Sequence, residues 1–459
     1  MDSQQMIIDH IAHLRSTFNQ GRTKPLPWRM NQLRALAKMI RDNEETLYRA
    51  VKVDLGKPKN EALTAEILTV QTEIREAMDE LKDWIKPTAV RTPFVFRPGI
   101  SQVYHDPLGV VLIIGAWNYP IQLVLSGLIG AIAAGNCVVL KPSELASETS
   151  KALAKLISAY LDHDAIRVIE GGVDETTVVL EQRFDHILYT GNARVARIVM
   201  AAAARHLTPV TLELGGKSPC YIDRSADLAQ AARRIAWGKF NNAGQTCIAP
   251  DYVLIEESVH DEFVRRLLDT IKRFYGSTPA DSPDYGRIIN ARHHRRLMAL
   301  MASGHAATGG TGDADTLYIA PTVLTGVSHD SPVMAEEIFG PILPVLKVDG
   351  LDDAITFIND RPKPLALYMF SENKGFIESM LTRTSSGGVC INHVMIQFGV
   401  GTLPFGGVGE SGMGGYHGKA SFETFSHQKS VLKDPFLIDL PIIYPPYKEK
   451  NLKWLRRLI

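Results

Sequence analysis

The chain has 459 residues, 45% of them hydrophobic and 22% charged, and its 50 basic side chains match its 50 acidic ones. This length favours two or three domains, the composition is typical of a soluble globular protein, and zero net charge argues against a nucleic-acid partner. Four widely spaced cysteines, with no CxxC pair and no zinc-like Cys/His cluster, predict a reducing compartment and no metal site. Because the N-terminus also lacks the pattern of a signal peptide, we expect a cytoplasmic protein.

The first 85 residues are expected to be helical. Apolar residues recur there at helical spacing, as in Leu33, Leu36, Met39 and Ile40. The proline-rich stretch 86–100 then predicts a connection or an exposed extension.

From residue 110 onward, short apolar runs alternate with helical patterns. Strands are expected at 110–114, 138–140, 166–170, 186–189 and 208–212. Helices are expected between them at 121–134, 147–161, 174–181 and 192–204. Such alternation predicts a doubly wound parallel sheet, in which ligands bind at the carboxyl ends of the strands.

The stretch 108–140 carries no charged residue, and 121–140 alone is long enough to span a bilayer. Polar residues and glycines interrupt this run, however, and its front half is typical of a fully buried strand. We therefore expect a buried strand, helix and strand here rather than a membrane span.

A second alternating series follows Gly215. Strands are expected at 220–222, 253–255, 343–348 and 366–370, and helices near 227–242, 258–274 and 351–359. The stretch 435–447 is rich in proline and aliphatic residues, as expected of an arm lying on a neighbour. The sequence thus predicts an α/β fold with two doubly wound parallel-sheet domains and a small oligomerisation arm.

Two segments carry the main chemical signal. Cys247 ends the stretch Asn-Asn-Ala-Gly-Gln-Thr-Cys, whose small and neutral polar residues would let a substrate approach the thiol. Glu213 lies 34 residues upstream and is followed by Leu214 and then by two glycines, where the backbone can bend and expose the carboxylate. A nucleophilic thiol and a carboxylate base are the minimum set for forming and then hydrolysing a thioester.

Asn118 follows directly on the expected strand 110–114, at the carboxyl edge of the sheet. Its side-chain amide is suited to donate to a developing oxyanion. The alternative is an asparagine that merely caps the next helix. Because Cys247 is a candidate nucleophile, we favour the role of Asn118 as an oxyanion donor.

Two further strand ends predict contacts to a dinucleotide. Lys141 and Glu144 lie where a strand turns into a helix and are placed to hold ribose hydroxyls, although a solvated turn would look the same. Gly191 and Asn192 close another strand and open an alanine-rich helix, whose exposed amides suit a pyrophosphate.

Glu337 and Phe339 lie just before a Gly-Pro turn. Glu337 is a candidate to accept hydrogen bonds from the nicotinamide ribose, and Phe339 is a candidate to pack against the nicotinamide. By composition alone, a helix end with a buried phenylalanine is the better interpretation of this segment.

The remaining cysteines, Cys137, Cys220 and Cys390, lie in apolar, strand-like contexts and are expected to be buried and structural. His393 and His417 are the histidines nearest to the expected active-site loops, and the sequence suggests no partner for either.

Together these segments resemble the signature set of the aldehyde dehydrogenase superfamily, in its usual order and over nearly the whole chain. The matching motifs are Trp117-Asn118-Tyr119-Pro120, Lys141-Pro142-Ser143-Glu144, Glu213-Leu214-Gly215-Gly216-Lys217, Gly244-Gln245-Thr246-Cys247 and Glu337-Ile338-Phe339-Gly340-Pro341. The C-terminal segments 404–412 and 425–430 resemble further hallmarks. The short N-terminus, with 208–213 and 416–419, is most similar to the class 3 subgroup, which comprises fatty and aromatic aldehyde dehydrogenases.

The resemblance implies a role for each motif. Cys247 would be the nucleophile, Glu213 the general base, and Asn118 with the Cys247 amide the oxyanion hole. The cofactor, NAD or NADP, would be bound by Trp117, Lys141, Glu144, Gly191, Asn192, Glu337 and Phe339. Residues 1–85 and 101–213 would form the dinucleotide-binding domain, 214–400 the catalytic domain, and 86–100 with 430–459 the bridging segments of a homodimer.

Two segments depart from the family pattern. The cofactor loop usually starts Gly-Ser and has a glycine five positions after the first, where this chain has Asn192 and Ala196. His393 follows Asn392 near the expected substrate tunnel, where many relatives carry aspartate. The first departure bears on cofactor packing and the second on substrate preference.

The expected reaction is oxidation of an aldehyde, of medium or long aliphatic chain or aromatic, through a thiohemiacetal and a thioester that a water activated by Glu213 hydrolyses. The alternatives are transfer of the acyl group to coenzyme A, hydrolysis by Cys247 without redox chemistry, and a silent binding protein. The C-terminal residues 448–459 mix basic and apolar side chains, which suits a dimer contact or a weak peripheral membrane contact.

Overall fold

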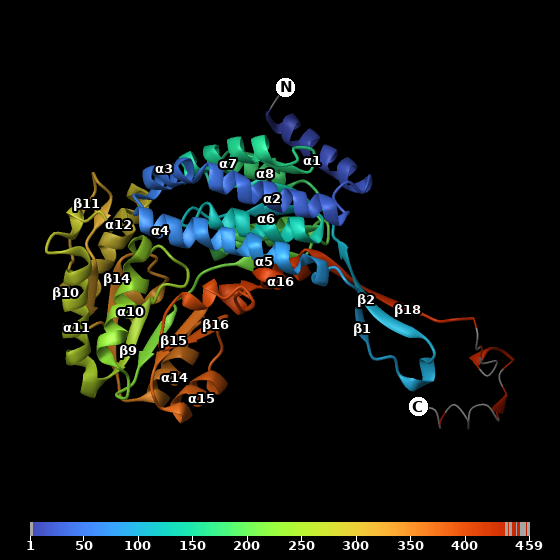
Figure 1. Ribbon diagram of the computed structural model, residues 1–459. Coiled ribbons are helices and arrows are strands. Elements are labelled where there is room, and N and C mark those ends of the chain that lie inside the picture. Colours follow the sequence, from blue (N-terminus) through green and yellow to red (C-terminus); the bar gives the residue numbers. More distant parts are fainter. Residues whose placement is uncertain (1–2, 437–438, 440–442, 447, 450–455, 457–459) are drawn as a thin grey trace.

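In the computed structural model, which describes residues 3–436, 439, 443–446, 448–449 and 456, the chain forms two lobes and an extended arm (Figure 1). Each lobe is built on its own sheet and its own hydrophobic core. The α/β class and the two-lobed arrangement expected from the sequence are confirmed.

The first lobe contains a six-stranded sheet in the order β17-β7-β6-β3-β4-β5. Its strands are β3 (Val110–Ile114), β4 (Cys137–Lys141), β5 (Ile166–Val168), β6 (His186–Thr190), β7 (Val210–Glu213) and β17 (Gly412–Met413). All neighbours are parallel except β17, which pairs antiparallel with β7 and adds an edge that the sequence did not predict. The strand order reverses between β3 and β6, the position at which doubly wound sheets bind ligands.

Helices pack around this sheet. They are α1 (Ser3–Asn19), α2 (Leu26–Asp42), α3 (Glu44–Leu55), α4 (Lys59–Ala62), the π-helical segment η1 (Leu63–Leu68), α5 (Thr69–Trp84), α6 (Gln122–Ala134), α7 (Ser147–Tyr160), α8 (Val173–Leu180), α9 (Ala193–Ala204) and α16 (Gly418–Thr424). Every residue of α6 is buried, as expected for the uncharged run. Among the described residues, no helix is both long and apolar enough to cross a membrane.

The second lobe contains a seven-stranded sheet in the order β10-β13-β14-β9-β8-β15-β16. Its strands are β8 (Pro219–Ile222), β9 (Tyr252–Glu256), β10 (His305–Thr308), β13 (Thr322–Thr325), β14 (Ile342–Val348), β15 (Ala366–Phe370) and β16 (Gly388–Ile391). Its neighbours are parallel except for the edge strand β10. A two-stranded ribbon is formed by β11 (Gly312–Asp313) and β12 (Tyr318–Ile319).

The helices of the second lobe are α10 (Leu228–Phe240), α11 (Glu257–Tyr275), α12 (Ala291–Leu300), α13 (Pro332–Ala335), α14 (Leu351–Asn359) and α15 (Lys374–Arg383). Short 3₁₀ segments in the chain are η2 (Phe94–Phe96), η3 (Asn241–Gly244), η4 (Pro279–Asp281), η5 (Met301–Ser303), η6 (Ile396–Gly399) and η7 (Gly409–Ser411). The helix expected at 227–242 therefore ends two residues early, because the chain turns into η3 after Phe240.

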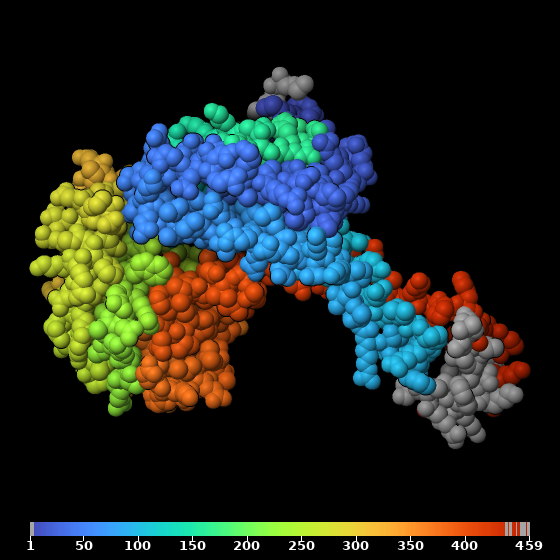
Figure 2. All heavy atoms as spheres, in the orientation of Figure 1, coloured from blue at the N-terminus to red at the C-terminus, as the bar shows by residue number. Residues whose placement is uncertain are grey.

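The arm is a three-stranded antiparallel sheet of β1 (Thr88–Val90), β2 (Ile100–Pro107) and β18 (Ser426–Lys433). Figure 2 shows it projecting away from the two lobes. The sequence had grouped 101–213 with the first sheet, but β2 belongs to the arm because it pairs along its whole length with the distant β18. Large apolar side chains of the arm are exposed, among them Phe94 at 78%, Ile100 at 57%, Phe96 at 56% and Leu432 at 52%.

Candidate active site

The carboxyl ends of β3, β4, β6 and β7 lie side by side at one edge of the first sheet. Residue pairing places Ile114 of β3 beside Lys141 of β4 and Tyr189 of β6, and Thr190 of β6 beside Glu213 of β7. The loops carrying Asn118 and Gly191 therefore leave the sheet at the edge that holds Lys141 and Glu213. The residues predicted from four separate motifs share the carboxyl edge of one sheet.

The cysteine loop faces this edge from the other lobe. Cys247 lies a few residues before β9, and so at the amino end of a strand of the second sheet rather than at a carboxyl end. The main chain of this loop is left-handed at Asn242 (φ 50°), Ala243 (φ 50°) and Gly244 (φ 74°). Two non-glycine residues in that region are strained, and strain of this kind clusters at functional sites.

Asn118 is not a helix cap. The first amides of the following helix, those of Ile121 and Gln122, donate instead to the Glu66 carboxylate, at 2.8 and 3.3 Å. The Asn118 side-chain amide donates to the main-chain oxygen of Gln245 at 3.1 Å, two residues before Cys247. Because an amide nitrogen carries two protons, this hydrogen bond uses only one of its two N–H groups.

Glu213 and Cys247 both lie in a poorly solvated site. Only 2% of Glu213 is exposed, and neither carboxyl oxygen has a hydrogen-bond partner among the described residues, so desolvation raises the pKa of this acid well above its ordinary value. Burial likewise raises the pKa of the Cys247 thiol, with further contributions from the negative charges of Glu337 and Glu213. The resting site therefore holds a protonated thiol and an acid with no partner.

The sugar-binding candidates differ in environment. Lys141 is 2% exposed, and its ammonium donates to the main-chain oxygens of Pro142 at 2.9 Å and Gly171 at 2.7 Å. Burial lowers the pKa of Lys141, while nearby acidic groups, Glu144 first among them, oppose that shift. Glu144 itself is exposed at the start of the turn.

The loop after β6 is shaped by its glycine. A Cβ on Gly191 would lie 2.2 Å from the Tyr189 hydroxyl oxygen, so no other residue fits without movement. The Asn192 side chain accepts from the amide of Val195 at 3.0 Å and so caps α9. Ala196, in place of the usual glycine, is buried against the first core.

Glu337 and Phe339 lie in the loop after the short α13, not at the end of a longer helix. The Glu337 carboxylate lies over Gly215, where a Cβ would be 2.1 Å from its Oε2. Burial and the charge of Asp251 raise the pKa of Glu337 to about 8, although the Gly216 amide donates to it. Phe339, at φ 48°, places its ring edge-on to Trp117 at 5.4 Å, so two predicted cofactor residues meet.

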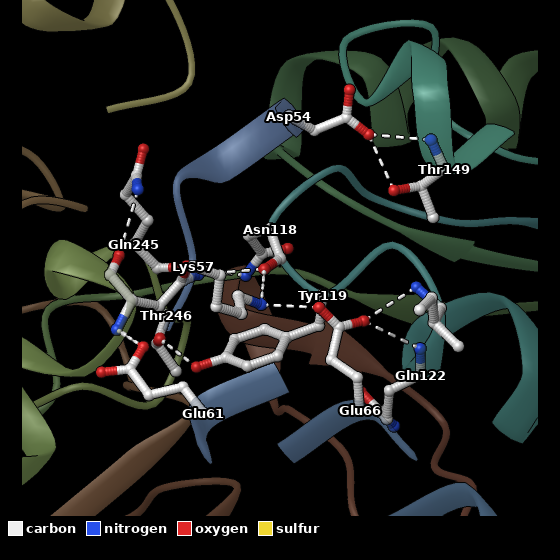
Figure 3. A network of polar contacts seen from close by, with 12 residues as sticks. Asp54, Lys57, Glu61, Glu66, Asn118, Tyr119, Gln122, Thr149, Gln245 and Thr246 are labelled. Atoms are coloured by element: carbon white, nitrogen blue, oxygen red, sulfur yellow. Dashed lines mark hydrogen bonds and ion pairs between the residues drawn. The ribbon is translucent and has the colours of Figure 1, made fainter. Parts of the chain in front are cut away.

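Sequence reasoning missed a layer of charged residues beneath the site. Figure 3 shows Lys57, Glu61 and Glu66, from the N-terminal segment of the first lobe, bonded to the turn at Asn118 and to the cysteine loop. No local pattern distinguishes these residues from the solvated face of a helix. Lys57 and Glu66 are nevertheless fully buried.

His417 also has a partner that the sequence did not suggest. Its Nε2 lies 2.9 Å from the Glu73 carboxylate, and both side chains are buried. Burial opposes protonation, but the Glu73 charge prevails and raises the pKa of His417. His393 lies elsewhere, with its ring edge-on to Trp237 at 5.9 Å.

The other cysteines are buried and free, as expected for structural residues. Cys137 and Cys220 are wholly inaccessible and Cys390 nearly so, whereas Cys247 is the partly accessible one of the four. Accessibility therefore separates the proposed nucleophile from the rest.

Residues 2–431 match the model of a protein family described as "Aldehyde dehydrogenase family". Aldehyde dehydrogenase family 3 member A2 of Rattus norvegicus is 52% identical over 446 residues, which cover 97% of this chain and 92% of the relative. The aldehyde dehydrogenase of Canis lupus familiaris described as dimeric and NADP-preferring is 51% identical over 442 residues, 96% of this chain and 98% of the relative. Among solved structures, the substrate-bound state of Staphylococcus aureus AldH superposes with a TM-score of 0.96 at 44% identity, covering 98% of this chain and 99% of the other.

The chain therefore belongs to the aldehyde dehydrogenase family. It is an NAD(P)-dependent oxidoreductase that acts on aldehydes, and its curated relatives place it in the class 3 subgroup. The resemblance inferred from the five motifs is confirmed.

Proposed function

We propose that Cys247 attacks the carbonyl carbon of the aldehyde and that Glu213 is the base of the reaction. The observation that supports this most directly is the convergence of three groups from two lobes: a partly accessible thiol, a buried carboxyl without partners, and the Asn118 amide anchored beside the cysteine loop. A carboxylate with a raised pKa is a stronger base, which suits it to take a proton from water.

Each protein group has one task. The Cys247 thiol releases its proton to solvent as its sulfur bonds to the carbonyl carbon, whose oxygen takes up the C=O π electron pair. This oxyanion is held by the second N–H of Asn118 and by the Cys247 amide. The nicotinamide, when bound, supplies the hydride acceptor. Glu213 then removes a proton from a water that attacks the resulting thioester, and the carboxylic acid leaves as the Cys247 thiol reforms.

The residues at the carboxyl edge fit a dinucleotide. Gly191 leaves the start of α9 open, Lys141 presents an ammonium beside the exposed Glu144, and the Trp117–Phe339 ring pair borders the loop of Glu337. We propose that Gly191, Lys141 and Glu144 hold the sugar and phosphates of the dinucleotide. The nicotinamide would be held by Trp117, Phe339 and Glu337. Glu144 favours a free 2′-hydroxyl and Lys141 tolerates a 2′-phosphate, so both NAD and NADP are candidates.

We further propose medium- or long-chain aliphatic or aromatic aldehydes as substrates. This rests on the class 3 relatives and on aromatic side chains near the cysteine loop. Tyr368 donates to the main-chain oxygen of Ile248 at 2.5 Å and accepts from the side chain of Gln397 at 3.3 Å. The next residue, Phe398, meets Phe405 with ring centroids 4.9 Å apart.

A homodimer in the cytoplasm is the proposed state of the enzyme. It is supported by the relatives described as dimeric and by the exposed apolar residues of the arm. The weak membrane contact suggested for 448–459 falls almost entirely outside the described residues.

The test follows reduced-nicotinamide absorbance with NAD and NADP separately, over short, aromatic and long-chain aldehydes. Cys247→Ala should abolish the signal while cofactor binding persists, and Cys390→Ala, at a buried strand position, should retain it. Wild-type rates in Cys247→Ala would refute the assignment of the nucleophile. Adding coenzyme A should change neither the rate nor the carboxylic acid product, and an acyl-CoA product would favour the acylating alternative.

A further inference from the structure

One buried polar network joins the N-terminal helices to both halves of the proposed site (Figure 3). It begins at Lys57, between α3 and α4, and at Glu66 in the π-helical segment η1. Neither residue is a candidate to touch substrate or cofactor, since both are fully enclosed by protein.

Lys57 is fixed by three partners. Its ammonium lies 2.6 Å from the Glu66 carboxylate, donates to the main-chain oxygen of Asn118 at 3.0 Å, and stands 4.0 Å from the centroid of the Tyr119 ring. Two of these three contacts are to the turn that carries the proposed oxyanion donor.

Glu66 holds the same turn from its other end. While one of its oxygens accepts from Lys57, the other accepts from the amides of Ile121 and Gln122, where α6 begins. A lone insertion of π-helix often marks a functional position, and here it carries this carboxylate. The ion pair therefore clamps residues 118–122 at both ends.

Residues 118–122 are also hydrogen-bonded to the cysteine loop. The Tyr119 hydroxyl and the Thr246 hydroxyl lie 2.7 Å apart, one residue before the thiol. The Asn242 side-chain amide donates to the main-chain oxygens of Asn118 at 2.9 Å and Gln245 at 3.1 Å. Any shift of the Asn118 main chain is thus carried into the loop that presents Cys247.

We propose that Lys57 and Glu66 are positioning residues of the reaction, which set the Asn118 amide and the Cys247 thiol at the separation that the oxyanion requires. The inference rests on the roles proposed above for Asn118 and Cys247. A buried ion pair is rarely more stable than apolar residues of equal volume, so its presence beneath the site is better explained by the geometry it imposes. Misplacing a reacting group by about 1 Å costs on the order of 100-fold in rate.

The variant that tests this is Lys57→Met with Glu66→Gln. It removes both charges together, keeps the side-chain volumes, and leaves an amide oxygen to accept from Ile121. We expect kcat to fall about 10- to 100-fold, with the hydride-transfer burst slowed and nicotinamide affinity unchanged. The matched control is Lys59→Met, which removes an exposed lysine paired with Glu45 and should leave kcat unchanged.

A double-mutant cycle separates positioning from a general loss of stability. If Lys57 acts through Asn118, its neutralisation should lower kcat in the wild-type background but have little further effect in Asn118→Ala. Lys57→Arg keeps the charge, yet its planar fork cannot reproduce the single ammonium position, so a folded Lys57→Arg enzyme should also lose kcat. Melting temperature and nicotinamide binding report folding in each case.

Wild-type kcat in the folded neutral double variant or in Lys57→Arg would overturn the proposal, as would a full additional loss in Asn118→Ala. An Asn118→Ala enzyme with wild-type kcat would instead refute the role proposed for Asn118 itself. The two failures are therefore distinguishable.

Discussion

The Glu337 carboxylate should destabilise the free enzyme increasingly as pH rises. Its pKa lies near 8 in the folded chain, against an ordinary value of 4.5, because the half-buried carboxylate is desolvated over Gly215 and lies near the charge of Asp251. At pH values below the ordinary pKa, both the folded and unfolded states are protonated and no penalty exists. Above it the unfolded state ionises first, so the free energy of unfolding falls as pH approaches 8.

The size of the penalty follows from those two values. Linkage gives about 1.4 kcal/mol at pH 5.5 and about 4 kcal/mol at pH 8 for a shift from 4.5 to about 8. A chain of 459 residues unfolds with an entropy of about 1 kcal/mol/K. Glu337→Gln should therefore raise the melting temperature by about 1 °C at pH 5.5 and by about 4 °C at pH 8.

The assay is thermal unfolding without nicotinamide at both pH values. Glu336→Gln is the matched control, because this neighbouring side chain is exposed and its main-chain oxygen, which accepts from Lys217 at 2.9 Å, is kept. An advantage for Glu337→Gln that does not grow with pH would refute the argument, as would the same growth in the control.

Three further predictions concern the site. Glu213→Gln should lower steady-state turnover by about 100- to 10,000-fold while leaving a stoichiometric burst of reduced nicotinamide, and loss of the burst as well would place Glu213 before hydride transfer. Gly215→Ala puts a Cβ 2.1 Å from the Glu337 carboxylate, so KM for the nicotinamide should rise more than KM for the aldehyde; the reverse order would contradict a cofactor role for this loop. Tyr119→Phe leaves the Thr246 hydroxyl without its partner at 2.7 Å and should reduce stability by about 1 kcal/mol; denaturant unfolding checks this, and no change would show that water replaces the bond.

Much of the architecture could be predicted because its signals are local. The strands expected at 110–114 and 366–370 have the predicted bounds, since each is a short apolar run that is buried on both faces. The motifs of Asn118, Glu213 and Cys247 could be recognised because each stands in a characteristic run of neighbours.

The remaining features depend on contacts between distant segments. The edge strands β17 and β10 have little pattern of their own, and β2 is defined by its pairing with β18. Lys57 looks like a surface residue until its partners are known, because a lysine is almost never fully buried unless it is paired. The left-handed backbone at Asn242 could not be predicted either, because the residue at that position is not a glycine.

The first lobe can be completed only late in synthesis, because it uses segments that come near the end of the chain. Its core includes Phe422 and Phe425, and its sheet is completed by β17, all of which come after the entire second sheet in the chain. A nascent chain that ends near residue 400 can therefore build the second core, while the first still lacks an edge strand and the helix α16. Until those segments are synthesised, the N-terminal part of the first lobe keeps its apolar surface exposed. We therefore expect chaperones to bind this part of the nascent chain on the ribosome.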